Sequence, residues 1–356
     1  MTVALRVLYS GAAAVMSLFL RVDPALVRSN ALTEEIAPSA SGITRIVLSV
    51  WERFDTLWYL HIARAGYDRP ESVVFYPLYP ALIRLLSPLT SSPLAAGLLV
   101  STAATFFLLL GIVKLARLDG DADRGVRAAL VCAVWPASFV LVAGYPESLV
   151  AALTVWAVYF ARSGRWASAG LAGLFAGFAK AVGVVSAVPL LFLAFRKGSR
   201  PVAFAALPLL APLVVLGVVA SLAGTSPASV YPTFWRTEVA FPWTTLHESI
   251  RQAFVGPDAL VGLNLGALAV VVALVLVVRT RPEHTLFALA AACFFLMKKT
   301  DPLLQSTLRY LLCVYPVYLS LGEVLDTRLA TALVALSMLG LNLVLLWHFL
   351  HWSLLI

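Results

Sequence analysis

The stretch 94-LAAGLLVSTAATFFLLLGI-112 decides the fold class of this chain, because it contains no charged side chain. An α-helix needs about 20 apolar residues to cross the hydrocarbon core of a membrane, so this run is long enough to span one. Similar runs recur along the chain, at 4–20, 201–223, 259–278 and 329–350. With a mean hydropathy of +0.92, the sequence predicts an all-α polytopic membrane protein.

The spacing of the apolar runs predicts about eleven transmembrane helices in a single membrane domain that covers residues 1–356. The first run has no convincing cleavage site of small residues at its end, so we expect it to remain as a span. The three cysteines lie in separate apolar runs. Their spacing indicates neither a metal site nor a disulfide framework.

The turns between the spans alternate in charge, which predicts the orientation in the membrane. Turns rich in lysine and arginine occur at 114–127, 162–165, 196–200 and 279–281. Cytoplasmic turns carry this excess, so we expect these turns in the cytoplasm, with Arg6 placing the N-terminus on the same side. The formal charge of +8 is then explained by these turns and does not require a nucleic-acid partner.

The opposite turns are expected to face the exoplasm. They include a long first loop at 21–90 with interfacial helices and a second long loop at 224–258. The assignment depends on a short hairpin at Lys180. If 167–193 formed one kinked helix instead, every later turn would change sides.

Polar side chains gather in 51-WERFDTLWYLHIARAGY-67, directly after the first apolar part of the chain. Asp55 is a candidate for a carboxylate that accepts a proton from an incoming hydroxyl group. Alternatively, Asp55 has only a structural role, as an acid that stabilises the positive end of a helix dipole. Glu52 is a rival for the same role. His61 is a candidate ligand-binding residue or an ordinary interfacial histidine.

Two further elements belong to the same predicted face. The segment 76–89 has an apolar stripe at helical spacing and predicts a helix on the membrane surface, with Tyr76 and Tyr79 at the level of the lipid headgroups. The sequence 145-YPES-148 predicts a helix start. Tyr145 and Glu147 there are candidates to bind a sugar or to orient a cation.

Four cations violate the charge rule because they fall on the predicted exoplasmic side: Lys180, Lys298, Lys299 and Arg309. They either extend to lipid headgroups or recognise a phosphate group, for which arginine offers a planar fork and lysine a point charge.

In their order and spacing, these motifs resemble the PIG-V-type mannosyltransferases, the GPI mannosyltransferase 2-like family, and their bacterial relatives. The matching segments are 51-WERFDTLWYLHIARAGY-67, 74-VFYPLYP-80 and 144-GYPES-148, while 308–322 resembles the family's penultimate helix more loosely. The resemblance implies the GT-C glycosyltransferase fold. In that fold the first exoplasmic loop carries surface helices and a catalytic acid, at the position of Asp55.

The resemblance also implies an activity, the inverting transfer of mannose from polyprenyl-phosphate mannose to an exoplasmic lipid or glycan. Asp55 would be the general base, and the other candidates would bind substrate, with Lys180 where the family commonly has an arginine. No cofactor, metal or nucleic-acid partner is implied; the partners are the lipid-linked donor, the acceptor and membrane lipids. Compact loops and alanine-rich spans favour a bacterial cytoplasmic membrane, where a GPI acceptor is not expected.

Two other classes of function remain open at this point. A transporter or flippase for a lipid-linked sugar predicts internal repeats and a site at the membrane midplane. A non-catalytic subunit of a glycan-assembly complex predicts that Asp55 and Glu147 lie far apart.

Overall fold

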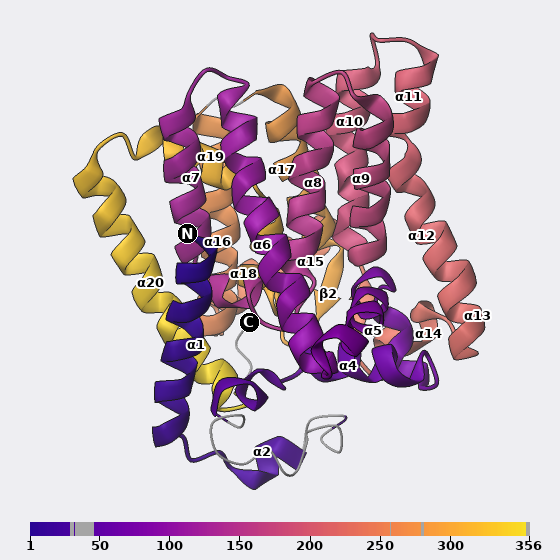
Figure 1. Ribbon diagram of the computed structural model, residues 1–356, viewed down its shortest axis with the longest axis vertical. Coiled ribbons are helices and arrows are strands. Elements are labelled where there is room, and N and C mark those ends of the chain that lie inside the picture. Colours follow the sequence, from indigo (N-terminus) through magenta and orange to yellow (C-terminus); the bar gives the residue numbers. More distant parts are fainter. Residues whose placement is uncertain (29–31, 33–45, 257, 279–280, 354–356) are drawn as a thin grey trace.

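The computed structural model describes residues 1–28, 32, 46–256, 258–278 and 281–353. It is a bundle of helices with a layer of short elements at one end (Figure 1). Part of the predicted first loop, and Arg279 of one predicted basic turn, lie outside these residues.

Within these residues, five helical segments are long and apolar enough to cross a membrane, and each coincides with a predicted run. They are α1 (Thr2–Phe19), α6 (Pro93–Arg117), the segment Ser199–Ala223, α16 (Ala259–Val277) and α20 (Arg328–Leu350). The segment Ser199–Ala223 comprises α11 (Ser199–Ala205), η6 (Leu207–Leu209), α12 (Leu210–Val214), η7 (Val215–Val219) and α13 (Ala220–Ala223). These findings confirm the polytopic helical fold, while the total of eleven spans stays a prediction.

Shorter helices complete the bundle. They are α7 (Ala122–Val134), η4 (Ser138–Leu141), α8 (Glu147–Arg162), α9 (Trp166–Ala179), η5 (Ala181–Ser186), α10 (Ala187–Ala194), α17 (Pro282–Leu296), α18 (Thr307–Tyr310), η8 (Leu311–Cys313) and α19 (Pro316–Val324).

The predicted hairpin at Lys180 is confirmed. Helix α9 ends at this residue, whose backbone is extended, and the chain returns through η5 and α10 (Figure 1). The two arms lie so close that a Cβ atom on Gly183 would be 2.0 Å from the carbonyl oxygen of Ala176. Only glycine fits there, so the sequence enforces the turn.

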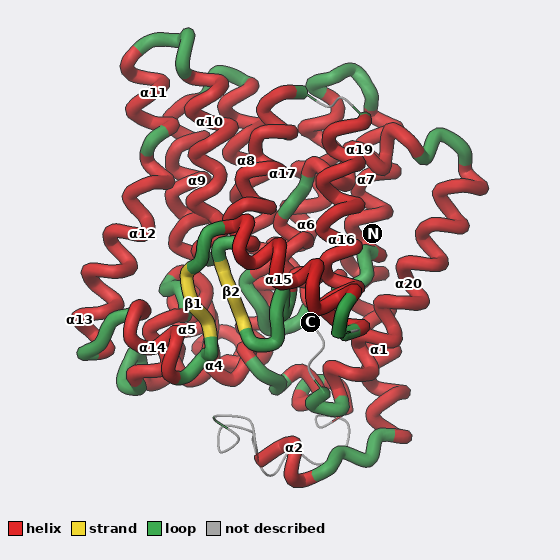
Figure 2. The backbone as a smooth tube through the Cα atoms, turned by 180° about the vertical axis from the view of Figure 1, so that it is seen from behind, coloured by secondary structure: helices red, strands yellow, loops and turns green. Residues whose placement is uncertain are grey.

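A layer of short elements covers the lower end of the bundle in Figures 1 and 2. We call it the loop layer. Its elements are α2 (Pro24–Arg28), η2 (Ser49–Trp51), α4 (Asp55–Ala65), η3 (Pro70–Val74), α5 (Leu78–Thr90), α14 (Pro227–Thr233), β1 (Thr237–Val239), α15 (Pro242–Phe254) and β2 (Lys298–Thr300).

The two strands of the loop layer pair antiparallel, with Thr237 opposite Thr300 and Val239 opposite Lys298 (Figure 2). The pairing joins the second predicted loop to the segment that follows α17. It places 298–300 beside 237–239, and the sequence of neither segment alone predicts this contact.

Helix α5 presents apolar side chains outward, because Leu85 and Leu89 are 70% and 80% exposed. That arrangement fits a helix at a membrane surface. Tyr79, however, is fully buried, and its hydroxyl group donates to the carbonyl oxygen of Gly97 at 2.9 Å. It packs α5 against α6, which differs from the headgroup position expected for it.

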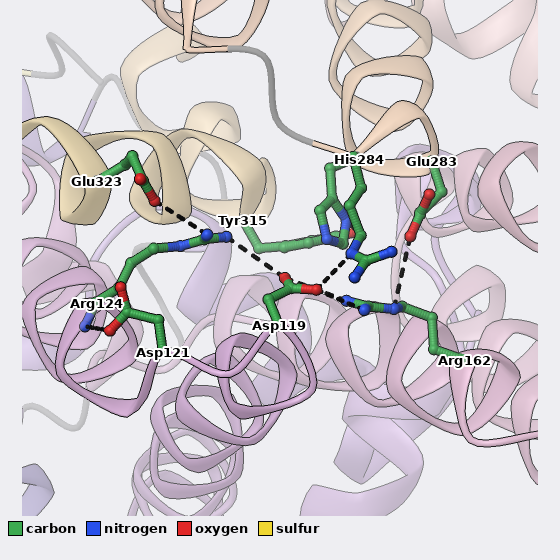
Figure 3. A network of polar contacts seen from close by, with 9 residues as sticks. Asp119, Asp121, Arg124, Arg162, Glu283, His284, Tyr315 and Glu323 are labelled. Atoms are coloured by element: carbon green, nitrogen blue, oxygen red, sulfur yellow. Dashed lines mark hydrogen bonds and ion pairs between the residues drawn. The ribbon is translucent and has the colours of Figure 1, made fainter.

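The opposite end of the bundle carries a network of acids and arginines (Figure 3). Asp119, in the turn after α6, is at its centre and accepts a hydrogen bond from Arg162 at 2.6 Å. The ion pairs of the network involve Asp119, Arg124, Arg162, Arg281, Glu283 and Glu323. They tie three of the four predicted basic turns together, those at 114–127, 162–165 and 279–281. Arg6 does not join them; it donates to the carbonyl oxygen of Val142 and lies 5.7 Å from the Trp51 ring centre.

Candidate active site

Asp55 is the first residue of α4, and the residue before it, Phe54, has a positive φ of 48°. A left-handed backbone costs free energy in a residue other than glycine, so the surrounding structure must hold this turn in place. The Asp55 carboxylate lies at the positive end of the helix dipole, a favourable position for an anion. Its side chain is 25% exposed.

Arg309 contacts Asp55 across the site. Its Nη1 donates to Oδ2 of Asp55 at 2.8 Å. Arg309 lies on α18, which also begins after a residue with positive φ, Ser306 at 67°. The two short helices that carry this ion pair therefore each start from a constrained turn.

Glu147 is the second carboxylate bound to Arg309. Its Oε1 lies 3.2 Å from Nε of Arg309, and the same oxygen accepts from Nζ of Lys180. Glu147 is fully buried as the first residue of α8. A buried carboxylate without a partner loses its hydration without compensation, and here Arg309 and Lys180 both pair with it. Asp55, Arg309, Glu147 and Lys180 thus form one chain of alternating charge.

Tyr310 lies among three cations. Nζ of Lys298 donates to its hydroxyl group at 2.9 Å, and Nζ of Lys180 lies 4.6 Å from its ring centre. The guanidinium carbon of Arg309 is 5.2 Å from the same ring. Burial alone would raise the pKa of Tyr310, but the positive charges of Lys298, Arg309 and Lys180 together lower its pKa to about 7.

The charges of the site do not balance. Lys180, Lys298 and Arg309 face two carboxylates, Asp55 and Glu147. Within the described part of the chain, no ion pair links Lys298 to a carboxylate, and Tyr310 is its hydrogen-bond partner. The site therefore has an excess of positive charge, which favours an anionic ligand.

Two more tyrosines surround the ion pairs. The guanidinium carbon of Arg309 lies 5.1 Å from the ring centre of Tyr145, whose buried side chain also interacts electrostatically with Asp55 and Glu147. Tyr231, on α14, interacts electrostatically with Tyr310 and with Asp55. Tyr310 and Tyr231 are residues that the sequence interpretation missed. In the sequence, the only feature that could have pointed to Tyr310 is its position directly after Arg309. Tyr231 has no comparable feature.

Lys299 lies apart from this cluster although it follows Lys298. It pairs with Glu248 on α15 at 2.9 Å. Successive side chains of a strand point to opposite faces, which separates the two lysines of β2.

The remaining candidates have other surroundings. Nε2 of His61 lies 2.6 Å from Oδ1 of Asp68, and Glu52 is buried at 4% exposure just before α4. Tyr76 is half-buried and packs against the apolar cluster around Val73. Of the eleven predicted site residues, the structure brings together six: Asp55, Tyr145, Glu147, Lys180, Lys298 and Arg309.

In the described part of the chain, no three His, Cys, Asp or Glu side chains lie together as metal ligands do. The chemistry that these residues offer is a partly exposed carboxylate beside a cluster of cations. Such an arrangement can take a proton from a hydroxyl group and hold an anionic leaving group nearby.

Comparisons with known proteins identify a family and a fold. The family model of the mannosyltransferases (PIG-V) matches residues 8–200. Among solved structures, ArnT from Cupriavidus metallidurans in the apo state, which has the GT-C fold, matches with a TM-score of 0.50 at 13% identity. The match covers 83% of this chain and 70% of that one, and at this identity it shows the fold alone. No curated protein matches the sequence.

Proposed function

Because this chain belongs to the mannosyltransferase (PIG-V) family, we propose that it transfers a mannosyl residue from polyprenyl-phosphate mannose to an exoplasmic lipid or glycan. The family and the GT-C fold make it a membrane glycosyltransferase. The donor, the stereochemistry and the residue roles below belong to the proposal.

The observation that carries the proposal is the contact of Asp55 with Arg309 beside the excess positive charge at Lys298. Asp55 acts as the general base. It takes the proton of the acceptor hydroxyl group while the hydroxyl oxygen attacks the anomeric carbon. The bond from that carbon to the phosphate oxygen breaks, and the configuration inverts. Polyprenyl phosphate leaves as an anion, so one carboxylate suffices, whereas glycoside hydrolysis needs two.

The phosphate of the donor binds to Lys298 and Lys180 beside Tyr310. Arg309 is already committed to two carboxylates and holds Asp55 in place. Of the three cations in the site, Lys298 is the one that pairs with no carboxylate among the described residues, so it is the first candidate to neutralise the leaving group. Tyr145 and Glu147 line the sugar side of the ion pair.

The loop layer faces the exoplasm in this proposal. Three of the four basic turns gather at the opposite end of the bundle, around Asp119 (Figure 3). Turns rich in lysine and arginine stay in the cytoplasm, which leaves the end that carries Asp55 outside. In a bacterium, the site would open from the outer face of the cytoplasmic membrane.

Asp55 and Glu147 both pair with Arg309, which argues against a non-catalytic subunit, for which these two acids were expected far apart. Their position at one end of the bundle also differs from the midplane site of a transporter. Neither alternative is favoured by a specific contact.

The proposal is tested with the full-length protein in liposomes and a membrane extract as the source of acceptor. One sample receives labelled polyprenyl-phosphate mannose, and the other receives labelled mannose linked to a nucleoside diphosphate. We expect label to reach a new lipid or glycan only from the lipid-linked donor. Transfer from the nucleotide donor alone, or movement of the intact lipid-linked sugar without transfer, would overturn the proposal.

A further inference from the structure

Asn264 is a fully buried asparagine inside α16, an otherwise apolar helix long enough to span the membrane. A polar side chain in such a helix is expected to hydrogen-bond to a neighbouring element, because the lipid offers no partner. Its Oδ1 accepts from the backbone N–H of Leu308 at 3.2 Å. Leu308 immediately precedes Arg309.

The orientation of the Asn264 amide follows from its second contact. Its Nδ2 donates to the carbonyl oxygen of Leu260, one turn earlier in α16, at 3.1 Å. The reversed orientation would place a donor against the N–H of Leu308 and an acceptor against the oxygen of Leu260. The helix itself therefore aims Oδ1 at α18.

Helix α18 needs such an acceptor. The first N–H groups of a helix have no partner within it and are usually capped by the preceding side chain. Ser306 occupies the N-cap position but makes no side-chain cap. Asn264 supplies the missing acceptor from a different helix.

Trp135 binds the other backbone polar group of Leu308, its carbonyl oxygen. Its Nε1 donates to the carbonyl oxygen of Leu308 at 3.3 Å, and the indole is buried at 4% exposure. The backbone N–H and carbonyl groups of Leu308 are thus fixed by α16 and by the end of α7. Both contacts are remote from Asp55 in the chain, and both act on the turn that presents Arg309.

We propose that Asn264 is a positioning residue for catalysis: with Trp135, it clamps the backbone of Leu308 and so fixes the Arg309 guanidinium against Asp55. This inference rests on the proposed function of Asp55 and Arg309. A displacement of about 1 Å at a reacting group can cost about 100-fold in rate, so the clamp affects turnover without touching the substrate.

The test uses Asn264→Leu, which keeps the approximate size of the side chain and removes the acceptor. We expect kcat to fall by about 10- to 100-fold in the full-length protein in liposomes. The matched control is Thr105→Val, which removes another buried hydrogen bond between a span and a short helix, from Thr105 on α6 to the carbonyl oxygen of Leu141 at the end of η4. The control is expected to keep its kcat.

A double-mutant cycle separates positioning from general loss of stability. Asn264→Leu is combined with Arg309→Lys, and the transfer rate is measured for the wild type, both single variants and the double variant. If Asn264 acts through Arg309, adding Asn264→Leu to the Arg309→Lys protein changes the rate less than threefold. Equal rate losses in both backgrounds would overturn the inference, as would a normal kcat in Asn264→Leu.

These results are distinguishable from failure of the proposed function. A normal rate in Asn264→Leu combined with a strong loss in Asp55→Asn would reject the positioning role of Asn264 and leave the proposed function intact. A normal rate in Asp55→Asn would reject the proposed base instead.

Discussion

The Asp55 carboxylate and the Arg309 guanidinium lie 2.8 Å apart, although 254 positions separate the two residues in the chain. The side chain of Arg309 is 7% exposed, and it also forms an ion pair with Glu147, which is fully buried. One cation thus compensates two carboxylates from different helices.

Removal of Arg309 should destabilise the protein as well as inactivate it. In Arg309→Gln, the arginine charge is lost while Glu147 remains buried with Lys180 as its remaining cation. Breaking a buried ion pair typically costs about 3–5 kcal/mol, so we expect a clear fall in the thermal unfolding temperature in detergent. The double variant with Glu147→Gln should regain part of that loss without regaining activity. An Arg309→Gln protein as stable as the wild type would contradict this role.

The neighbouring lysines Lys298 and Lys299 should differ in their effect on the donor. Lys298→Ala removes a charge-assisted contact to the phosphate, which is worth about 1.5–3 kcal/mol. We expect the KM for polyprenyl-phosphate mannose to rise roughly 10- to 100-fold. Lys299→Ala serves as the matched control because Lys299 pairs with Glu248 outside the cluster. Similar KM values for the two variants would count against the assignment of the phosphate site.

The affinity for the donor should weaken as the pH rises through about 7. The cations around Tyr310 lower its pKa to about 7, against the opposing effect of burial, so its phenolate forms near that pH. A phenolate neutralises Lys298, its hydrogen-bond partner, and competes with the donor phosphodiester, which keeps its single charge throughout this range. We expect KM for the donor to rise above pH 7 in the wild type, while Tyr310→Phe shows no such rise. A KM that falls over this range would refute the argument.

Asp119 should contribute to stability at the opposite end of the bundle. Burial raises its pKa, but hydrogen bonds from Arg162 and Arg281 outweigh burial and hold the pKa below its ordinary value of about 3.9. A carboxylate with a lowered pKa stabilises the fold above about pH 4, and this contribution is lost as the pH falls through the folded-state value. Asp119→Asn should lower the free energy of unfolding at pH 7 by about 2 kcal/mol. Thermal unfolding at pH 7 checks this, and an unchanged midpoint would contradict it.

The sequence alone predicted the parts of this fold that are set by contact with lipid, which a helix can span only if it is long and apolar. A span needs a long apolar run, and the runs at 94–112 and 259–278 correspond to α6 and α16. The hairpin at Lys180 was also predictable, because the basic turns keep to one side only if the chain reverses there.

Part of the site was predictable because charge is costly near a membrane. Asp55, Glu147 and Arg309 stood out as charged residues on the predicted exoplasmic side of an apolar chain. Which residues meet was not predictable, because the partners come from distant segments and neither segment encodes the other's position.

The details that were missed depend on tertiary structure. The strands β1 and β2 have three residues each, too short for a sequence pattern, yet their pairing decides that Lys298 joins the cluster while Lys299 does not. Tyr79 resembled an interfacial tyrosine, but its hydroxyl group finds partners on α6. Asn264 is visible in the sequence as a polar residue in an apolar run, but its partner, the backbone N–H of Leu308, was not predictable.

The most direct test of the central claim compares Asp55→Asn with Glu52→Gln, the variant of the rival acid, in single-turnover transfer from labelled polyprenyl-phosphate mannose. Loss of a general base typically costs about 10²–10⁴-fold, so we expect a loss of this size in Asp55→Asn, in a protein that still folds and still binds the donor. A transfer rate in Asp55→Asn equal to that of the wild type, or a loss of this size found only in Glu52→Gln, would contradict the account.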